Sequence, residues 1–306
     1  MTIGGTGDSR ASKDQRRDAA RLKAKALREQ QKKKDRRNRV FLQGGLVVAA
    51  VAIVAIVSLV IVNNIRPEGP GPKNMASDGI LIGQGMTVTE TVALEPEATP
   101  IPSVPDTTGA VADIRIYVDY LCPYCGDFEA TNSAQIEKWV ESGAATVEIH
   151  PLSILTSKSA GTQYSLRAAN AAACVANYSP DDFYAFNSAM FENQPNEGST
   201  GLSDKDIKKV IKDAGVRTAV TAIDTCVDDQ TFKSWVQDAT SRALTGPIPN
   251  STLAAVSTTP TVLVNGKQYV GSLDDPKEFA SFVLQAAGET YSTSTATPTP
   301  EPATAG

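Results

Sequence analysis

Two cysteines separated by two residues, Cys122 and Cys125 in the sequence Cys-Pro-Tyr-Cys, are the side chains of this chain best suited to chemistry. Thiol–disulfide exchange needs an attacking thiolate and a second thiol within reach, and this spacing supplies both. A run of β-forming residues precedes the pair, and Pro123 suits the first turn of a helix. We therefore expect Cys122 at a helix N-terminus, where the helix dipole favours its thiolate, and Cys125 one turn further in as the resolving thiol.

A passive disulfide and half of a metal site are the other interpretations of this pair. Zinc requires four ligands, but Cys174 and Cys226 lack the close spacing and His150 is the single histidine. We expect no metal and no other cofactor. Four cysteines allow three pairings. The short gap favours Cys122 with Cys125, which leaves Cys174 with Cys226 as a structural bridge rather than a second redox pair, since no activating motif surrounds them.

Residues 1–39 form a basic segment, expected in the cytoplasm. They contain 14 Lys or Arg against five Asp or Glu, a net charge of +9, whereas the whole chain carries −5 and the remainder therefore −14. Attraction to anionic lipid headgroups and a simple topology signal both explain this charge. We expect no nucleic-acid partner, because no aromatic platform or base-reading motif accompanies the basic residues.

Residues 40–62 are expected to form one transmembrane signal-anchor helix. Of these 23 residues, 19 are apolar and two are glycine. At about 1.5 Å per residue, a helix of this length crosses a hydrocarbon core of about 30 Å. A cleaved signal peptide is the alternative, but its apolar region is shorter and ends at a small-residue cleavage site. The basic segment keeps the N-terminus inside. All four cysteines are then expected outside a cell membrane crossed once, where disulfides persist.

The remaining chain divides into three parts. Residues 63–109 contain seven prolines and are interpreted as a Pro-rich linker, with a short docking strand near 79–83. Residues 110–289 are the folded domain. Residues 290–306 are rich in Thr, Ser, Pro and Ala and are interpreted as a disordered tail.

The pattern of the folded domain predicts an α/β layer with inserted helices. A strand precedes the cysteine pair, a helix contains it, and a second strand follows at 145–152. Helical signals then continue from about 155 to 245. Strand signals return at 261–264, followed by an Asn-Gly hairpin turn and a capped helix. This order is typical of an α/β fold that carries a helical insertion.

Two motifs resemble those of the DsbA-like thiol–disulfide oxidoreductases, which have the thioredoxin fold. Residues 117–125, Tyr-Val-Asp-Tyr-Leu-Cys-Pro-Tyr-Cys, are similar to the family's active-site segment. Residues 258–266, Thr-Thr-Pro-Thr-Val-Leu-Val-Asn-Gly, are similar to its cis-proline strand and hairpin. The 134 residues between Cys125 and Pro260 fit the family's helical insertion, whereas a glutaredoxin-like core needs only a few dozen.

The resemblance is to membrane-anchored, actinobacterial-type members, and it implies several features of the site. Pro260 should be cis and face the disulfide, and Thr259 should present backbone groups to an extended substrate. Pro123 and Tyr124 would complete the active-site surround. A second disulfide in the helical insertion, which this family type carries, would join Cys174 to Cys226.

The sequence departs from the family at Ile116. Thioredoxin-fold oxidoreductases often have a buried acid at this position, six residues before the first cysteine, so the proton acceptor for Cys125 is unassigned. Water or Asp119 would have to replace it, although Asp119 is at least as well explained as a surface or sheet-end carboxylate. His150 is better explained as a packing or hydrogen-bonded residue than as a proton-transfer group.

The resemblance implies a membrane-anchored, extracytoplasmic protein thiol–disulfide oxidoreductase. Its substrates would be exported proteins that are unfolded or reduced, and its reoxidant would be a membrane protein of the DsbB or VKOR type. We expect a monomer. Two alternatives stay open: a disulfide reductase or isomerase on the same fold, and a tethered chaperone-like binding module.

Overall fold

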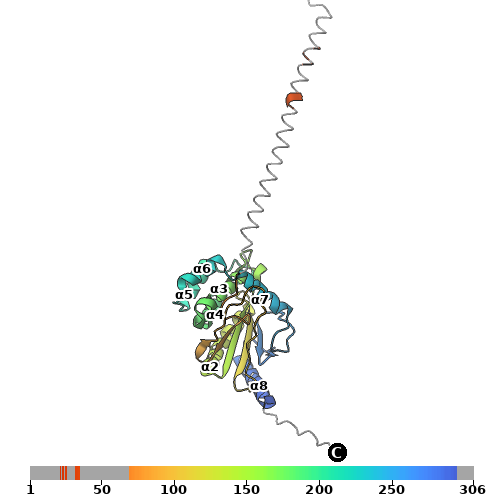
Figure 1. Cartoon of the computed structure of the whole chain (residues 1–306). Coiled ribbons are helices and arrows are strands. Elements are labelled where there is room, and N and C mark those ends of the chain that lie inside the picture. Colours follow the sequence, from red (N-terminus) through yellow and green to blue (C-terminus); the bar gives the residue numbers. More distant parts are fainter. Residues whose placement is uncertain (1–20, 22, 24, 26–31, 35–68, 295–306) are drawn as a thin grey trace, which may run out of the picture. The chain divides into compact units, whose positions relative to one another are not determined.

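The computed structural model describes residues 69–294 and six basic residues of the N-terminal segment, Arg21, Lys23, Lys25 and 32–34 (Figure 1). The chain divides into two compact units, Met1–Pro67 and Glu68–Gly306. The six basic residues are helical and exposed. The helix expected over 40–62 lies outside the described residues, and among the helices that are described none is long and apolar enough to cross a membrane.

A six-stranded sheet in the order β2-β1-β4-β3-β5-β6 organises the second unit. Strands β3 and β4 are parallel, and the other neighbouring strands are antiparallel. Parallel neighbours need a crossover connection, which helix α2 (Pro123–Ser142) supplies. The strands are β1 (Ile80–Gly83), β2 (Thr87–Val88), β3 (Ala112–Val118), β4 (Ala145–Pro151), β5 (Thr261–Val264) and β6 (Lys267–Gln268).

Strand β3 lies in the middle of the sheet and is buried along its whole length. Because side chains alternate between the faces of a strand, Ile114, Ile116 and Val118 share one face. They belong to the same apolar core as α2 and the C-terminal helix α8 (Pro276–Ser294). The opposite face carries Arg115, which donates to Glu148 at 2.9 Å and so pairs a charge that would otherwise be buried alone.

Five helices between β4 and β5 form the insertion, and Figure 1 shows α3, α4, α5 and α6 grouped together. Helix α3 is its centre, since 12 of its 15 residues are buried and its alanines allow close packing. A disulfide between Cys174 of α3 and Cys226 of α6 closes a separation of 52 residues. The helices are α3 (Tyr164–Tyr178), α4 (Phe183–Glu192), α5 (Asp204–Asp213), α6 (Val220–Asp229) and α7 (Lys233–Thr245).

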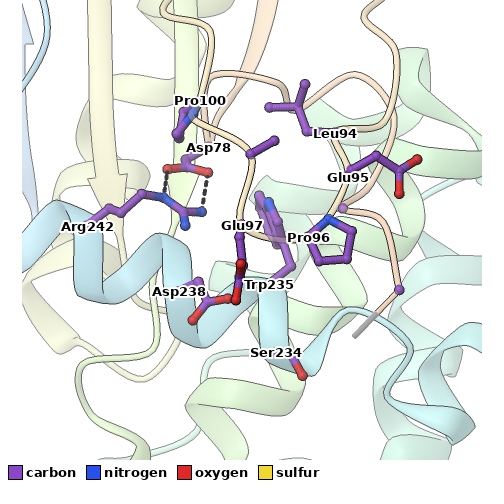
Figure 2. Close-up of a pocket in the computed structure, with 13 residues that line it drawn as sticks. Asp78, Leu94, Glu95, Pro96, Glu97, Pro100, Ser234, Trp235, Asp238 and Arg242 are labelled. Atoms are coloured by element: carbon purple, nitrogen blue, oxygen red, sulfur yellow. Dashed lines mark hydrogen bonds and ion pairs between the residues drawn. The ribbon is translucent and has the colours of Figure 1, made fainter. Parts of the chain in front are cut away.

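The interpretation of residues 63–109 as a linker is wrong for its described part, which begins at residue 69. Prolines interrupt regular elements there, but polar contacts with helices α3 and α7 hold the irregular chain in place. Buried Asn74 donates to the Ala176 carbonyl at 2.9 Å. Asp78 accepts from Arg242 of α7 at 2.7 and 2.8 Å, a pair that Figure 2 shows.

The same segment also approaches the sheet and helix α7 closely. The short docking strand expected near 79–83 is strand β1, residues 80–83, which pairs with β4 through Ile80 opposite Ile149. A Cβ atom at Gly71 would lie 2.9 Å from the ring of Trp235, so a glycine lets the chain lie against that ring. The folded domain therefore begins well before residue 110.

The boundary of the tail also differs from the expectation. Helix α8 continues to Ser294, so residues 290–294 are helical rather than part of a disordered tail. The Ser and Thr side chains that made this stretch resemble a tail donate to helix carbonyls three or four residues earlier, as Thr293 does to Glu289 at 2.9 Å. Residues 295–306 lie outside the described part.

Removing the Cys174–Cys226 bridge should lower the free energy of unfolding by about 4 kcal/mol. The bridge restricts the unfolded chain over a loop of 52 residues. The measurement is urea unfolding of the Cys174→Ala/Cys226→Ala variant. Because both side chains are buried, their replacement also removes packing contacts. A second comparison isolates the effect of the bridge: the Cys122→Ala/Cys125→Ala variant is unfolded with the Cys174–Cys226 bridge intact and again after chemical reduction of that bridge. Equal urea midpoints in that comparison would contradict a stabilising bridge.

Candidate active site

The Cys-Pro-Tyr-Cys motif occupies the first turn of α2. Cys122 is the N-cap, with extended backbone angles (φ −78°, ψ 115°), and Pro123 is the first helical residue. The Cys122 N–H donates to the Asp119 carbonyl at 2.9 Å, and the Cys122 carbonyl accepts from the Cys125 N–H at 3.0 Å. The turn between β3 and α2 thereby holds the Cys122 thiol at the positive end of the helix dipole.

Cys122 lies in an environment that favours its thiolate. It is a free thiol and 5% exposed. When protonated, its Sγ donates to the Thr259 carbonyl at 3.0 Å, a contact that by itself favours the thiol. A hydrogen bond from the Cys125 thiol lowers the pKa of Cys122 to about 6; burial opposes this shift, and the Thr259 side chain and the N–H groups of Cys125 and Tyr124 support it. At neutral pH Cys122 is therefore mainly the nucleophilic thiolate.

Cys125 has the opposite character. It is a free thiol, only 1% exposed. Burial raises its pKa well above the ordinary value, and the neighbouring Cys122 raises it further. One thiol is thus ionised near the surface while the other stays protonated inside. This asymmetry is what exchange requires of an attacking thiol and a resolving thiol.

The loop before β5 faces the two cysteines. The Thr259–Pro260 peptide bond is cis, as the family resemblance implies. Thr261 pairs with Tyr117 near the end of β3, which brings the loop beside the turn that carries Cys122. Thr259 is buried, and Pro260 is half-buried. Backbone groups of this loop therefore border the reactive sulfur.

Pro123 and Tyr124 form the exposed border of the site. Tyr124 is 64% exposed although it is a large aromatic residue. Isolated exposed aromatics are common on proteins, but one between two redox cysteines offers contact area to a substrate chain. The structure thus brings together six of the residues that the sequence selects: Cys122, Pro123, Tyr124, Cys125, Thr259 and Pro260.

Asp119 directly follows β3, so it lies at the end of the sheet as one interpretation had it, but it is fully buried and not a surface carboxylate. Its two oxygens accept from the Leu121 N–H at 2.9 Å, the Leu155 N–H at 2.8 Å and the Ser165 hydroxyl at 2.6 Å. Burial raises the pKa of Asp119, and these hydrogen bonds oppose the rise. The side chain therefore fixes the turn that leads into α2 and joins it to α3.

Glu129 is a buried acid near the site that sequence reasoning missed. It lies one helical turn after Cys125 and is 7% exposed. Its Oε1 accepts from the Ser188 hydroxyl at 2.8 Å and from the Asn187 amide at 3.2 Å. Burial raises the pKa of Glu129 to about 7, against these two hydrogen bonds. The spacing of four from Cys125 was the available signal, because it puts both side chains on one helix face.

Gln194, just after α4, is a second residue that the sequence did not reveal. Its amide nitrogen donates to the Tyr120 carbonyl at 3.2 Å and to the Cys122 carbonyl at 2.9 Å. A Cβ atom at Gly126 would lie 2.4 Å from its other amide atom, so a glycine here makes room for this side chain. The helical insertion thus contacts the active-site turn directly.

His150 does not join the site. It is buried on the other face of the sheet and stacks on Tyr117, with ring centroids 4.4 Å apart. Its Nε2 lies 3.4 Å from a Glu148 oxygen. Burial by itself would raise the pKa of Glu148, but His150 and Arg115 lower it to about 2. Packing therefore explains His150 better than proton transfer does.

Cys174 and Cys226 are also remote from the reaction, since they form the disulfide of the helical insertion. Ile116, where the family often has an acid, packs in the apolar core of the sheet. In the part of the chain that the structure describes, no three His, Cys, Asp or Glu side chains are grouped to hold a metal ion.

Comparison with known proteins agrees with this geometry. A family model described as thioredoxin matches residues 107–284. The reduced DsbA of Mycobacterium tuberculosis is 27% identical, with a TM-score of 0.50, over 71% of this chain and 100% of its own. The reduced disulfide bond oxidoreductase DsbG of that organism is 27% identical, with a TM-score of 0.51, over 72% of this chain and 95% of its own.

A curated relative of known sequence is the serine/threonine-protein kinase PknE of Mycobacterium tuberculosis. It is 27% identical to this chain over 179 residues. These residues are 57% of this chain but only 30% of the kinase. The similarity to this relative therefore concerns one part of a much longer protein.

Alkylation of the reduced chain by iodoacetamide should modify Cys122 alone, with a rate that rises through a midpoint near pH 6. The midpoint reports the lowered pKa of Cys122, and Cys125 is both buried and protonated. Mass spectrometry after timed quenching identifies the alkylated cysteine and gives the rate of its alkylation. In Cys125→Ala the midpoint should move to higher pH, because the strongest hydrogen bond to the thiolate is lost. A wild-type midpoint near the ordinary thiol value contradicts the stabilised thiolate.

Glu129→Gln should stabilise the protein above pH 7 and much less at pH 5. The pKa of Glu129 is raised from 4.5 to about 7 on folding, so stability falls as the pH rises between these values. At pH 8 the buried charge costs on the order of 3 kcal/mol. Gln keeps an oxygen that accepts both hydrogen bonds. The measurement is thermal unfolding of wild type and Glu129→Gln at pH 8 and at pH 5. An equal gain in stability at both pH values would show that ionisation of Glu129 is not the cause of the gain.

Proposed function

Since this chain belongs to the thioredoxin family, and its solved relatives there are DsbA-like, we propose that it is a thiol–disulfide oxidoreductase that introduces disulfides into exported proteins. The observation that carries the proposal is the stabilised Cys122 thiolate. A stabilised thiolate favours the reduced enzyme, and a dithiol that prefers to be reduced makes an oxidising disulfide. Cys122 and Cys125 are the redox pair.

The reaction begins with the Cys122–Cys125 disulfide. A substrate thiolate attacks the Cys122 sulfur, the bond between the two enzyme sulfurs breaks, and Cys125 leaves with the electron pair and takes up a proton. The second thiolate of the substrate then attacks the substrate sulfur that is bonded to Cys122. A disulfide forms within the substrate, and Cys122 is released as a thiolate. The substrate loses two electrons and the enzyme gains them, so each turnover requires reoxidation.

The cis-proline loop suits the binding of an extended substrate. The Thr259 carbonyl already accepts from the Cys122 thiol, and the backbone beside Pro260 borders the sulfur that a substrate must approach. Main-chain hydrogen bonds at such a loop accept many sequences, because they use groups that every chain carries. Tyr124 adds exposed aromatic contact next to the motif. This arrangement favours unfolded or reduced proteins as substrates.

We propose that the domain lies outside the cell membrane. Residues 40–62 would span the membrane once, with the basic segment in the cytoplasm. The Cys174–Cys226 disulfide supports this placement, because structural disulfides persist in oxidising compartments. Reoxidation would then come from a membrane protein of the DsbB or VKOR type, and the domain would act as a monomer.

A reductase or isomerase is the second candidate, and the extent of the same pKa shift favours it. A Cys122 pKa of about 6 stabilises the reduced enzyme less than the pKa of about 3.5 in DsbA does, and it is closer to the pKa of about 7 in thioredoxin. The direction of electron flow depends on the reduction potential of the Cys122–Cys125 pair, so a measurement of that potential distinguishes the two candidates.

The Cys122–Cys125 pair of the full chain should equilibrate with glutathione at a potential above about −200 mV, less reducing than thioredoxin at about −270 mV. The stabilised Cys122 thiolate is the physical reason. Alkylation of the free thiols followed by mass spectrometry gives the reduced fraction in each buffer. A potential near that of thioredoxin would support the reductase instead.

Cys125→Ala separates both redox candidates from a binding module. The free Cys122 thiolate of this variant attacks a disulfide of an oxidised substrate and displaces one substrate thiolate. Because no resolving thiol is present, the substrate should remain on Cys122 as a mixed disulfide. Cys122→Ala in the same assay is the matched control and should trap nothing. If Cys125→Ala also traps nothing from a mixture of reduced and oxidised test proteins, the redox function is wrong.

A further inference from the structure

A cavity of about 330 Å³ lies beside the sheet, on the face opposite helix α2. Tyr117 of β3 and His150 of β4 line it, and both alternate along their strands with residues that pack in the core with α2. Leu152, just after β4, continues this wall, and Ala239 and Ala243 of α7 form another. The sheet and an inserted helix therefore enclose a space that the redox cysteines do not line.

The inner surface of the cavity is mainly apolar. Four of the residues that line it, Tyr117, Leu152, Ala243 and Ile248, belong to one cluster of buried hydrophobic side chains. Ala239 beside them is only 1% exposed. An apolar molecule that entered would leave water for this surface, which is the main driving force for binding in such a site.

Prolines form the rim where the cavity reaches the surface. Pro102, Pro247 and Pro249 are exposed, and Pro100 is half-buried. The proline ring fixes the backbone angle φ, so this rim has little conformational freedom to lose when a molecule binds.

Hydrogen bonds also hold the walls of the cavity together. Arg115 of β3 donates to the Pro249 carbonyl at 2.7 Å. Asn250 donates to the Ser103 carbonyl at 2.9 Å, and the Ser103 hydroxyl donates to Glu148 of β4 at 2.8 Å. The loop after α7, the N-terminal segment and the sheet are thus joined before any ligand arrives, and a site formed in advance binds at a lower entropic cost.

The Asp78–Arg242 ion pair is the polar edge of the cavity. Figure 2 shows the pair from a smaller neighbouring hollow, which Asp78, Pro100 and Arg242 also line. Arg242 donates to Asp78 from Nε and Nη2. A guanidinium group has further N–H donors on Nη1, and within residues 69–294 these donate to no other group. Arg242 can therefore donate to a ligand without leaving Asp78.

The size and charge of the cavity restrict the molecule that fits. An apolar cavity of about 150 Å³ is known to bind benzene, so about 330 Å³ accommodates two fused rings. Asp78 and Arg242 neutralise one another, so a charged ligand would lose its hydration without meeting an unpaired opposite charge. An uncharged ligand with one acceptor for Nη1 satisfies both conditions.

We propose that this cavity binds an uncharged small molecule that has two fused rings and one hydrogen-bond acceptor directed at Arg242. The rings would lie against the apolar cluster, and the acceptor would lie at the edge of the cavity that the ion pair forms. None of the redox residues takes part, so the result of the test below does not depend on the proposed function.

A second hollow, of about 350 Å³, is the competing site. It lies along the N-terminal segment, where Val92, Ile101 and Val104 are exposed. The described residues that line it carry no charged side chain. A ligand there would keep much of its surface in water and would meet no charged donor, so the cavity beside α7 is favoured.

The test is a titration of coumarin into the full chain, followed by NMR of labelled methyl groups. Coumarin is uncharged and has two fused rings and a carbonyl acceptor. The methyl signals of Leu152 and Ile248 should shift and saturate with a dissociation constant below about 1 mM, as expected for about ten well-buried atoms. The signals of Val92 and Val104 should not move, because these residues border the competing hollow.

Two variants test the walls of the cavity. Ala239→Phe places a ring inside it and should weaken coumarin binding by about tenfold or more. Arg242→Met removes the charged donor and should weaken binding by about tenfold. Ala134→Phe is the matched control, because Ala134 is exposed on α2, and its affinity should equal that of wild type.

Three results would overturn the inference: methyl shifts that do not saturate, shifts at Val92 and Val104 in place of Leu152 and Ile248, or equal affinity in Ala239→Phe and wild type. Unchanged affinity in Arg242→Met would overturn the class of ligand, since its acceptor would then have no partner. The methyl shifts of the wild-type chain keep the inference testable if Ala239→Phe does not fold.

Discussion

The hydrogen bond between the Cys122 sulfur and the Thr259 carbonyl joins residues that are 137 positions apart, and most of the fold is needed to make it. The sulfur is placed by the turn between β3 and α2. The carbonyl is placed by the antiparallel pairing of β5 with β3, which sets Thr261 opposite Tyr117. The inserted helices α3 to α7 lie between β4 and β5 in the sequence, so the length and packing of the insertion must allow β5 to pair with β3 in this register. A shift of one residue in β5 would turn its buried side chains to the wrong face and remove the carbonyl.

The two thiols show how burial can have opposite consequences within one helical turn. At Cys122, hydrogen-bond donors outweigh burial and the pKa falls to about 6. At Cys125, burial dominates and the pKa rises well above its ordinary value. The first helical turn divides these environments, because its N–H groups point toward Cys122 and its interior side faces the core. The chemical difference between two identical side chains is therefore produced by the position of a helix end.

Local signals in the sequence predicted the redox motif, the central strands and the helical insertion, since each depends on spacing or on a short pattern. The cis peptide bond before Pro260 was expected from the family resemblance. The segment from residue 69 was misjudged because its stability comes from distant partners such as Arg242 for Asp78, which no local pattern contains. Glu129 was missed for a related reason. A glutamate on a helix is normally expected to face solvent, and its burial follows only from the docking of α4, which brings Asn187 and Ser188.

The two edges of the sheet are formed by β2 and β6, which have two residues each. An edge strand exposes unpaired backbone groups that can template the addition of another strand, and short or charged edges reduce this hazard. β6 also carries an exposed lysine, Lys267. If this protein works on unfolded chains, it is surrounded by segments that seek a strand to pair with. Its short edges then protect it from co-aggregation with its own substrates.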